Sequence, residues 1–243
     1  MNGLQQVERV PSLETPERIL IVGAHPDDPD AFCGGSVAAW TDGGAEVWYL
    51  IVTSGDKGVP DAETDLTTFT ETREQEQLSS AEYLGAQGVT FLRYLDGEVF
   101  DSLELRERIT LEIRRFKPDL MITHDPLTRN YRQHPDHRAV GFAALHSAFP
   151  TSHLPTFFPQ HAQDGYESHV TRQVLLFGSD KPDTFIDVGA TFERKIEALE
   201  MHVSQEAAFH GALRERMGQR AETAGEQSGQ YDLAEAFLFV DLG

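Results

Sequence analysis

The chain has 243 residues, of which 20 are basic and 40 acidic, giving a formal net charge of −20 at pH 7. Such a charge repels nucleic acid and anionic membrane surfaces, so neither is expected as a partner. The single cysteine, Cys33, excludes an intramolecular disulfide and suits a reducing compartment. No window approaches the roughly 18 apolar residues of a membrane span, and no leader-like segment opens the chain, so we expect a soluble cytoplasmic protein.

The first elements form a βαβ unit. Residues 1–17 are polar and without period, so we expect an N-terminal arm there and one domain over 18–243, with no internal boundary. Residues 18–22 are apolar and β-branched, which is typical of a buried strand. Gly34 and Gly35 predict a turn into a short helix at 36–41 that Ser36 caps. A parallel strand at 46–52 follows.

The rest of the chain continues to alternate between predicted helices and predicted strands. After a loop at 59–69, apolar periodicity predicts helices at 70–84, 103–116, 137–149, 191–205 and within 207–230, and strands at 89–92, 119–123, 173–177, 185–188 and 236–240. Asp136 is expected to cap the helix at 137–149. Residues 150–170 have no period and are interpreted as a surface loop, a candidate lid or oligomer contact. This order predicts an α/β fold with a mainly parallel, doubly wound central sheet.

Two polar motifs follow strands of this sheet. One contains His25, Asp27 and Asp28, and the other contains His134, Asp136 and His137. Loops at the carboxyl ends of parallel strands converge on one crevice. Two imidazoles and one carboxylate around an open position are the ligands of hydrolytic zinc sites, and His25, Asp28 and His137 can supply them. Zinc polarises a carbonyl and lowers the pKa of water to ~7, so such a site attacks amides or esters.

The remaining residues of the motifs suit proton transfer. Asp27 could act as general base on water. As imidazolium, His134 could stabilise an oxyanion or protonate a departing amine, with Asp136 orienting it and raising its pKa. In a competing interpretation, the first motif is a solvated turn and the second an ordinary helix start. Because both motifs lie at strand-to-helix loops, we favour a metal hydrolase.

The paired motifs Ala24-His25-Pro26-Asp27-Asp28 and His134-Pro135-Asp136-His137 resemble those of the PIG-L/LmbE-like family of zinc-dependent N-acetylglucosaminyl deacetylases. Further segments similar to family landmarks are 53–58, Arg73 in its helix, 84–85, Asp96-Gly97, 118–119 and 195–205. The resemblance implies a Rossmann-like three-layer fold over 18–243 and release of acetate from an N-acetylglucosamine-type sugar or conjugate, a small-molecule partner.

The resemblance also implies roles for individual residues. It makes His25, Asp28 and His137 the metal ligands, Asp27 the general base and His134 the oxyanion-stabilising residue. Arg73 and Asp96 match positions that contact the sugar in the family. The competing interpretation of these two is a solvated helix charge and a turn aspartate.

The chain departs from the family pattern at Pro29, where many members have Glu, and no role is assigned to Pro29-Asp30. Arg132 stands where some members have a tyrosine, with Tyr131 one place further back. His124 is interpreted as supporting the site rather than binding metal, and His202 as a residue that packs or forms a hydrogen bond.

Alternatives remain for the activity. The same machinery could cleave a larger amide of a sugar or thiol conjugate. A non-catalytic sugar- or nucleotide-binding module is a rival, although the first loop has no G-x-G-x-x-G pattern and its carboxylates repel phosphate. Fe²⁺ could occupy the same ligands as Zn²⁺. A homo-oligomer is compatible with the sequence.

Overall fold

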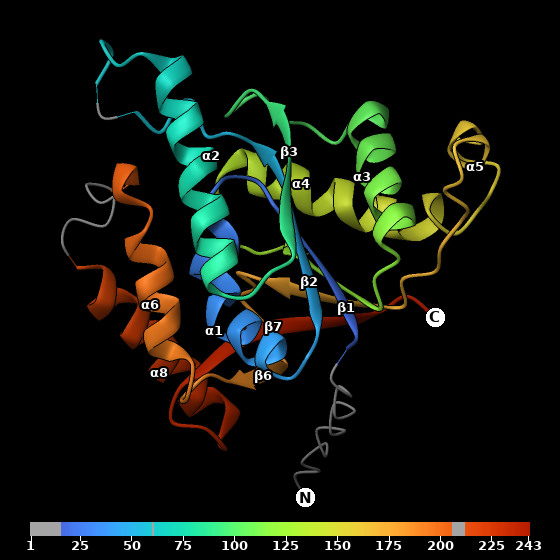
Figure 1. The fold of residues 1–243 in the computed structure, drawn as a ribbon. Coiled ribbons are helices and arrows are strands. Elements are labelled where there is room, and N and C mark those ends of the chain that lie inside the picture. Colours follow the sequence, from blue (N-terminus) through green and yellow to red (C-terminus); the bar gives the residue numbers. More distant parts are fainter. Residues whose placement is uncertain (1–15, 60, 206–211) are drawn as a thin grey trace, which may run out of the picture.

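The computed structural model describes residues 16–59, 61–205 and 212–243, which form one α/β domain (Figure 1). Its elements in chain order are β1 (Arg18–Gly23), α1 (Asp28–Asp42), β2 (Glu46–Thr53), α2 (Leu66–Tyr83), β3 (Gly88–Tyr94), α3 (Leu103–Phe116), β4 (Leu120–His124), α4 (Pro135–His146), η1 (Ser147–Thr151), α5 (Gln160–Gln163), β5 (Gln173–Phe177), β6 (Thr184–Asp187), α6 (Phe192–Glu200), η2 (Val203–Gln205), α8 (Leu213–Ser228) and β7 (Ala234–Asp241).

The seven strands form one sheet in the order β3-β2-β1-β4-β5-β7-β6. Neighbours from β3 to β5 are parallel, whereas β7 runs antiparallel to both β5 and β6. The chain moves outward from β1 to β3 and then returns to place β4 on the other side of β1. Because ligand crevices form at such a switch point, the gap between the carboxyl ends of β1 and β4 is the expected site. The predicted Rossmann-like, mainly parallel fold is confirmed.

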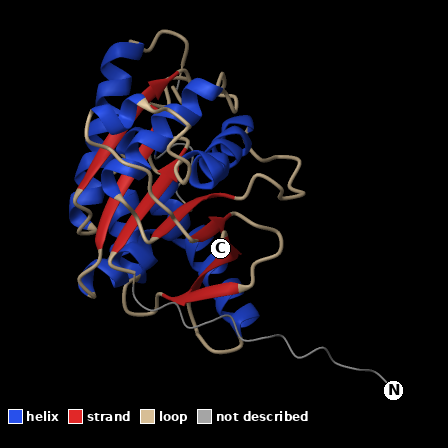
Figure 2. Cartoon of the chain, turned by 90° about the vertical axis from the view of Figure 1, so that its right-hand side faces the viewer, coloured by secondary structure: helices blue, strands red, loops and turns tan. Residues whose placement is uncertain are grey.

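Alternation along β1 divides the apolar core into two layers. Ile19 and Ile21 face a cluster built with α1, α2 and α6, whereas Leu20 and Val22 face a cluster built with α3 and α4. Side chains two residues apart share one face of a strand, so a strand buried on both faces is continuously apolar. Figure 2 shows the resulting sheet with helices on both sides.

The first helix begins earlier than predicted. Helix α1 starts at Asp28, with Pro29 in its first turn, where a fixed φ and a missing N–H are both favourable. The predicted start at Ser36 is wrong, because Gly34 and Gly35 lie inside the helix beyond a non-helical Cys33 (φ −141°). Ser36 does not cap a helix, since its hydroxyl and backbone N–H both donate to Glu235.

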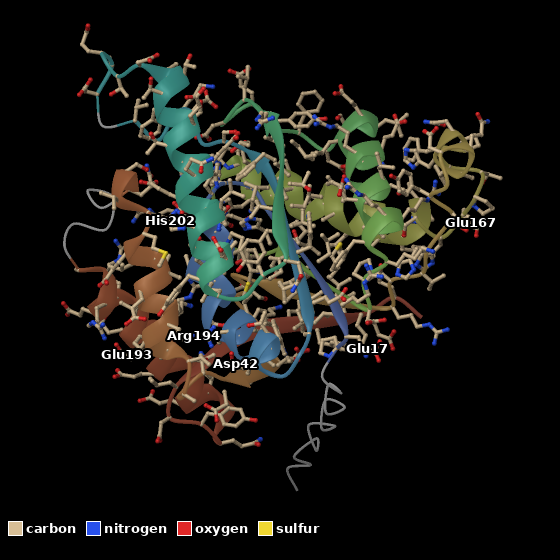
Figure 3. The ribbon with its side chains drawn as sticks, viewed as in Figure 1. Glu17, Asp42, Glu167, Glu193, Arg194 and His202 are labelled. Carbon is tan, nitrogen blue, oxygen red and sulfur yellow. The ribbon has the colours of Figure 1, made fainter. Side chains whose placement is uncertain are left out.

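Other boundaries shift by a few residues. Helix α2 begins at Leu66 because the Asp65 side chain accepts a hydrogen bond from the Thr67 N–H, so the predicted loop at 59–69 is shorter. Helix α6 ends at Glu200 and is followed by η2. Arg194 of α6 pairs with Asp42 at the end of α1, and both are labelled in Figure 3. Residues 1–15 of the predicted arm, and 207–211 of the helix predicted within 207–230, lie outside the described residues.

The stretch 150–170 contains the short helix α5 and is attached to α3. The Arg114 guanidinium, at the end of α3, donates to the carbonyl oxygens of Thr151, Leu154, Phe157 and Phe158. His169 Nε2 lies 2.8 Å from the Pro118 carbonyl oxygen, ahead of β4. These contacts attach the stretch to α3 and to the segment ahead of β4, and its role as a lid or an oligomer contact stays a prediction. Among the helices described, none is long and apolar enough to cross a membrane.

Candidate functional site

The two predicted motifs meet at the switch point of the sheet. The first lies between β1 and α1, and the second forms the start of α4 after β4. Asp27 has left-handed backbone geometry (φ 85°), which turns the chain from the strand into the helix. Its carbonyl oxygen accepts the first helical hydrogen bond, from the Ala31 N–H at 2.9 Å. The loop is therefore tight, and its histidine and both aspartates are held by the ends of regular elements.

His25, Asp28 and His137 form a compact group of potential metal ligands. Asp28 Oδ1 lies 3.2 Å from His137 Nε2, and Asp28 Oδ2 lies 3.4 Å from His25 Nδ1. The two ring nitrogens are 3.3 Å apart. One ligand atom from each residue lies within 4.8 Å of the others, so the group could hold a metal ion. Burial alone would raise the pKa of Asp28, but the imidazoles of His137 and His124 hold that pKa well below its usual range.

The other nitrogen of His25 faces two carboxylates. Nε2 lies 3.1 Å from Asp96 Oδ1 and 3.2 Å from Asp136 Oδ2. A proton on Nε2 therefore leaves the Nδ1 lone pair directed at Asp28 and His137, as in metal sites where a carboxylate orients a histidine ligand. Burial lowers the pKa of His25, but hydrogen bonds to Asp136, Asp28 and Asp96 outweigh it and raise the pKa well above its usual value.

A second group of ligand-type atoms, from His25, Asp96, His134 and Asp136, fits a metal less well. Asp136 already accepts hydrogen bonds from the N–H groups of Gly97 (2.7 Å) and Val99 (3.3 Å). Asp96 accepts one from the Lys57 N–H. Burial would raise the pKa of Asp96, but His25 and the Lys57 N–H lower it to about 2. These carboxylates are therefore positioned to orient His25.

Asp136 does not cap α4 and does not orient His134 as predicted. The cap is His134, whose Nδ1 accepts a hydrogen bond from the Asp136 N–H at 3.3 Å. The Asp136 carboxylate is fully buried, 3.9 Å from His134 Nδ1 and closer to His25. Because its backbone N–H serves the cap, its side chain is free to turn inward beneath the His25 ring.

His134 lies beside the ligand group, with its ring 4.6 Å from that of His25 and 5.5 Å from that of His137. Because Nδ1 accepts a backbone hydrogen bond, the neutral ring has its proton on Nε2. Burial and the charge of His25 lower the pKa of His134 despite Asp136. Asp136 acts to raise the pKa as predicted, but the net shift is downward. In this arrangement His134 can donate a hydrogen bond from Nε2 as a neutral imidazole.

Asp27 is held by Arg73, which does not extend into solvent. The Arg73 guanidinium is 3% exposed and donates to Asp27 Oδ2 at 2.9 Å, to the Pro26 carbonyl at 2.8 Å and to the Gly55 carbonyl at 3.0 Å. Burial raises the pKa of Asp27, opposed by Arg73 and assisted by Asp28. Arg73 is thus not a solvated helix charge, and it orients the Asp27 carboxylate; its contact with a sugar stays a prediction.

His124 supports the site, as the sequence indicated. It is 1% exposed, its ring stacks on that of His137 at 4.0 Å, and its Nε2 accepts the Ala24 N–H at 3.1 Å. Burial and His137 lower its pKa to about 3, so its ring is neutral. His124 therefore fixes both the first motif and one predicted ligand. Tyr131, by contrast, is fully exposed and shares none of these contacts.

Sequence reasoning missed Asp30, which is fully buried below the first motif. Its carboxylate lies 2.8 Å from His202 Nε2, which is 172 residues away in the sequence. His202 lies beside α2 (Figure 3), where it is buried and hydrogen-bonded, in agreement with the sequence interpretation. Only a weak indication of this cluster is present in the sequence. Gln77 and Ser80, the other partners of Asp30, are three residues apart and therefore share one face of a helix, but this spacing does not point to Asp30.

Comparisons with known proteins agree with this site. Residues 20–148 match the profile of a family described as PIG-L: GlcNAc-PI de-N-acetylase. Diacetylchitobiose deacetylase from Thermococcus kodakarensis is 32% identical over 189 residues, covering 78% of this chain and 70% of that protein. The structure of N,N'-diacetylchitobiose deacetylase from Pyrococcus horikoshii superposes with a TM-score of 0.87 at 29% identity, covering 93% of this chain and 84% of that one.

The same fold also occurs in an enzyme that is named for a different reaction. The structure of a 4-carboxy-2-hydroxymuconate hydratase from Pseudomonas putida superposes with a TM-score of 0.77 at 21% identity, covering 92% of this chain and 96% of that one. Such a likeness concerns the fold alone, so the reaction has to be argued from the side chains of the site.

Proposed function

Since this chain belongs to the PIG-L family, we propose that it is a zinc-dependent hydrolase that removes the N-acetyl group from an N-acetylglucosamine-type sugar or conjugate and releases acetate. The observation that carries the proposal is the group His25, Asp28 and His137, with Asp27 directly before Asp28 in the same loop and held there by Arg73. The relatives from Thermococcus kodakarensis and Pyrococcus horikoshii are both named as deacetylases of diacetylchitobiose, whose scissile bond is an N-acetyl amide.

The residues of the site fit a zinc ion. His25 Nδ1, His137 Nε2 and one Asp28 oxygen are the nitrogen and oxygen donors that zinc takes in hydrolytic sites, where a position is left for water or substrate. The Asp96 and Asp136 carboxylates orient His25 for this purpose. When bound, zinc would polarise the amide carbonyl and lower the pKa of water. Fe²⁺ would accept the same donors.

Asp27 is proposed as the general base. Its partly exposed carboxylate has a raised pKa, which favours proton acceptance, and Arg73 fixes its Oδ2. It takes a proton from the attacking water and then delivers that proton to the amine nitrogen as the C–N bond breaks. The water oxygen and its second proton leave with the acetyl group as acetic acid, which ionises to acetate, and the sugar retains a free amine, so atoms and protons balance without a further reactant.

His134 is proposed to stabilise the developing oxyanion by donating a hydrogen bond from Nε2. Its Nδ1 is engaged by the Asp136 N–H, so the ring acts as a neutral donor rather than as an acid. Asp136, Asp96 and Arg73 are positioning residues in this scheme, because their contacts lead to His25 and Asp27 rather than to the reacting atoms.

The test is hydrolysis of N-acetylglucosamine, diacetylchitobiose and matched conjugates carrying a longer acyl group, with free amine and acetate measured together. We expect equal amounts of amine and acetate, a preference for the acetyl compounds, and loss of turnover with retained zinc in Asp27→Asn. Faster cleavage of the longer acyl group would instead identify an amidase of larger conjugates. Binding of the sugars without any amine release from zinc-loaded protein would favour the non-catalytic module.

A further inference from the structure

Asp30 lies at the centre of a buried polar network next to the catalytic loop. Its Oδ2 accepts hydrogen bonds from Ser80 Oγ at 2.6 Å and Gln77 Nε2 at 3.0 Å, and lies 2.8 Å from His202 Nε2. Asp30, Gln77 and Ser80 are all fully buried. A carboxylate without solvent needs such donors, because an unpaired buried charge is strongly unfavourable. The network therefore gives the Asp30 carboxylate a defined position.

Gln77 connects this carboxylate to Asp27. The Gln77 amide donates from Nε2 to Asp30 and accepts the Asp27 N–H at Oε1, at 2.8 Å. A flipped amide would direct its NH₂ group at the Asp27 N–H and its oxygen at the Asp30 carboxylate, so both contacts would be repulsive. The Asp30 charge thus dictates which end of Gln77 faces Asp27.

Asp27 needs such support because its backbone is strained. A residue other than glycine at φ 85° is strained and persists only where its surroundings hold it. Two residues do so: Arg73 holds the side-chain carboxylate and the Pro26 carbonyl, and Gln77 accepts the Asp27 backbone N–H. Without Gln77 the Asp27 N–H would lose its acceptor and Arg73 alone would hold the Pro26–Asp27 peptide, so the carboxylate would be less firmly positioned.

We propose that Asp30 is a positioning residue for the general base: through Gln77 it holds Asp27 in the left-handed conformation that places its carboxylate beside the metal ligands. This inference rests on the proposed function, since it assigns Asp30 to the deacetylation reaction. It gives Pro29-Asp30 a role, with Pro29 starting α1 and Asp30 turned down toward α2 and His202. No direct contact of Asp30 with substrate is involved.

The test compares kcat, KM and zinc content of Asp30→Asn and Gln77→Met with the wild type, using diacetylchitobiose. Asp30→Asn removes the charge that orients the amide, and Gln77→Met removes the connection while keeping the Asp30 carboxylate with its other donors. In both variants we expect kcat to fall by about 10- to 100-fold, as for a misplaced catalytic group. KM and zinc content should stay within about twofold, because no ligand or substrate contact is changed.

A rescue variant separates positioning from general destabilisation. In Asp30→Asn/Gln77→Glu, the new amide can donate to the new carboxylate, which still accepts the Asp27 N–H, so the connection is rebuilt with its polarity reversed. Most of the kcat lost in Asp30→Asn should return. Glu235→Gln is the matched control: it also removes a buried charge that binds α1, through Gly35 and Ser36, but has no link to Asp27, so it should lower the melting temperature and leave kcat unchanged.

Wild-type kcat in folded Asp30→Asn and Gln77→Met, or no recovery in the double variant, would overturn the positioning role alone. A wild-type protein that is loaded with zinc and releases no acetate from any N-acetyl sugar would overturn the proposed function and this inference with it.

Discussion

Asp136 Oδ2 lies 3.2 Å from Nε2 of His25, while Nδ1 of the same ring faces Asp28 and His137. One imidazole thus connects a fully buried carboxylate to the proposed zinc ligands. The carboxylate is fixed in turn by the N–H groups of Gly97 and Val99, so the loop after β3 contributes to the orientation of a residue after β1. The sheet order places β1 between β2 and β4, which brings the loops after β1, β3 and β4 to the same edge of the sheet.

Asp136→Asn should weaken zinc binding by about 10- to 100-fold, because a neutral amide is a poorer acceptor for the His25 Nε2–H. The measurement is competition for zinc with a chromogenic chelator. Asp125→Asn is the control, since Asp125 is equally buried nearby but its side chain caps the turn at Leu127. Equal zinc affinity in Asp136→Asn and the wild type would remove the positioning role.

His134→Ala should lower kcat by about 10²- to 10³-fold with zinc content unchanged, because an oxyanion donor is lost. His134→Gln should recover part of this loss, since an amide N–H can donate where a neutral imidazole did. Steady-state rates of acetate release measure both. No recovery with glutamine would indicate that the imidazole has to ionise. His146→Ala removes another half-exposed histidine of α4 and should leave kcat unchanged.

Gly55→Ala should displace Arg73 from Asp27. The added Cβ would stand 1.8 Å from Arg73 Nη1, at a residue whose φ is +66°. Gly44→Ala is the matched control, because Gly44 also has a positive φ (+92°) but no atom within 4 Å of the added Cβ. Both variants should lose about 1 kcal/mol of stability from backbone strain. Only Gly55→Ala should also lose kcat, and equal kcat in the two would contradict the role given to Arg73.

Asp101 pairs with Arg106 of α3, and its carboxylate also lies 2.8 Å from His146 Nδ1 at the end of α4. Because these contacts connect the two helices through one carboxylate, the stability that they contribute should be sensitive to acid. Burial would raise the pKa of Asp101, but hydrogen bonds from Arg106 and His146 lower it. A lowered folded pKa gives stability that is present above the unfolded value of about 3.9 and is lost as the pH falls through the folded value.

Urea unfolding of metal-stripped wild type and Asp101→Asn should therefore show a stability difference at pH 6 that shrinks below pH 4. A difference that stays constant or grows toward low pH would contradict the lowered pKa of Asp101.

The sequence predicted which loops form the site, because alternating elements determine a parallel sheet and its carboxyl edge gathers the following loops. It could not predict where individual side chains turn. Asp136 was expected to cap a helix that His134 caps instead, since either residue type can accept the free N–H groups. The start of α1 was missed because Gly34-Gly35 is typical of a turn, whereas Pro29 and the left-handed Asp27 begin the helix.

The contacts of Arg73 and Asp30 were not predicted, for a related reason. Their partners, Asp27 and His202, lie 46 and 172 residues away, and no local spacing predicts such pairs. The residue types themselves argue against burial of Arg73 and Asp30, because charged residues are rarely buried unless they are paired. Long-range pairing inside the fold thus converts two apparently solvated residues into supports of the catalytic loop.

The most direct test of the account is acetate release by metal-stripped protein during titration with zinc. Release from diacetylchitobiose should be absent without metal, rise with each addition and level off at about one zinc per chain. His25→Ala should stay inactive at that concentration. Full acetate release by the stripped wild type, or a normal titration by His25→Ala, would contradict a zinc-dependent deacetylase built on His25, Asp28 and His137.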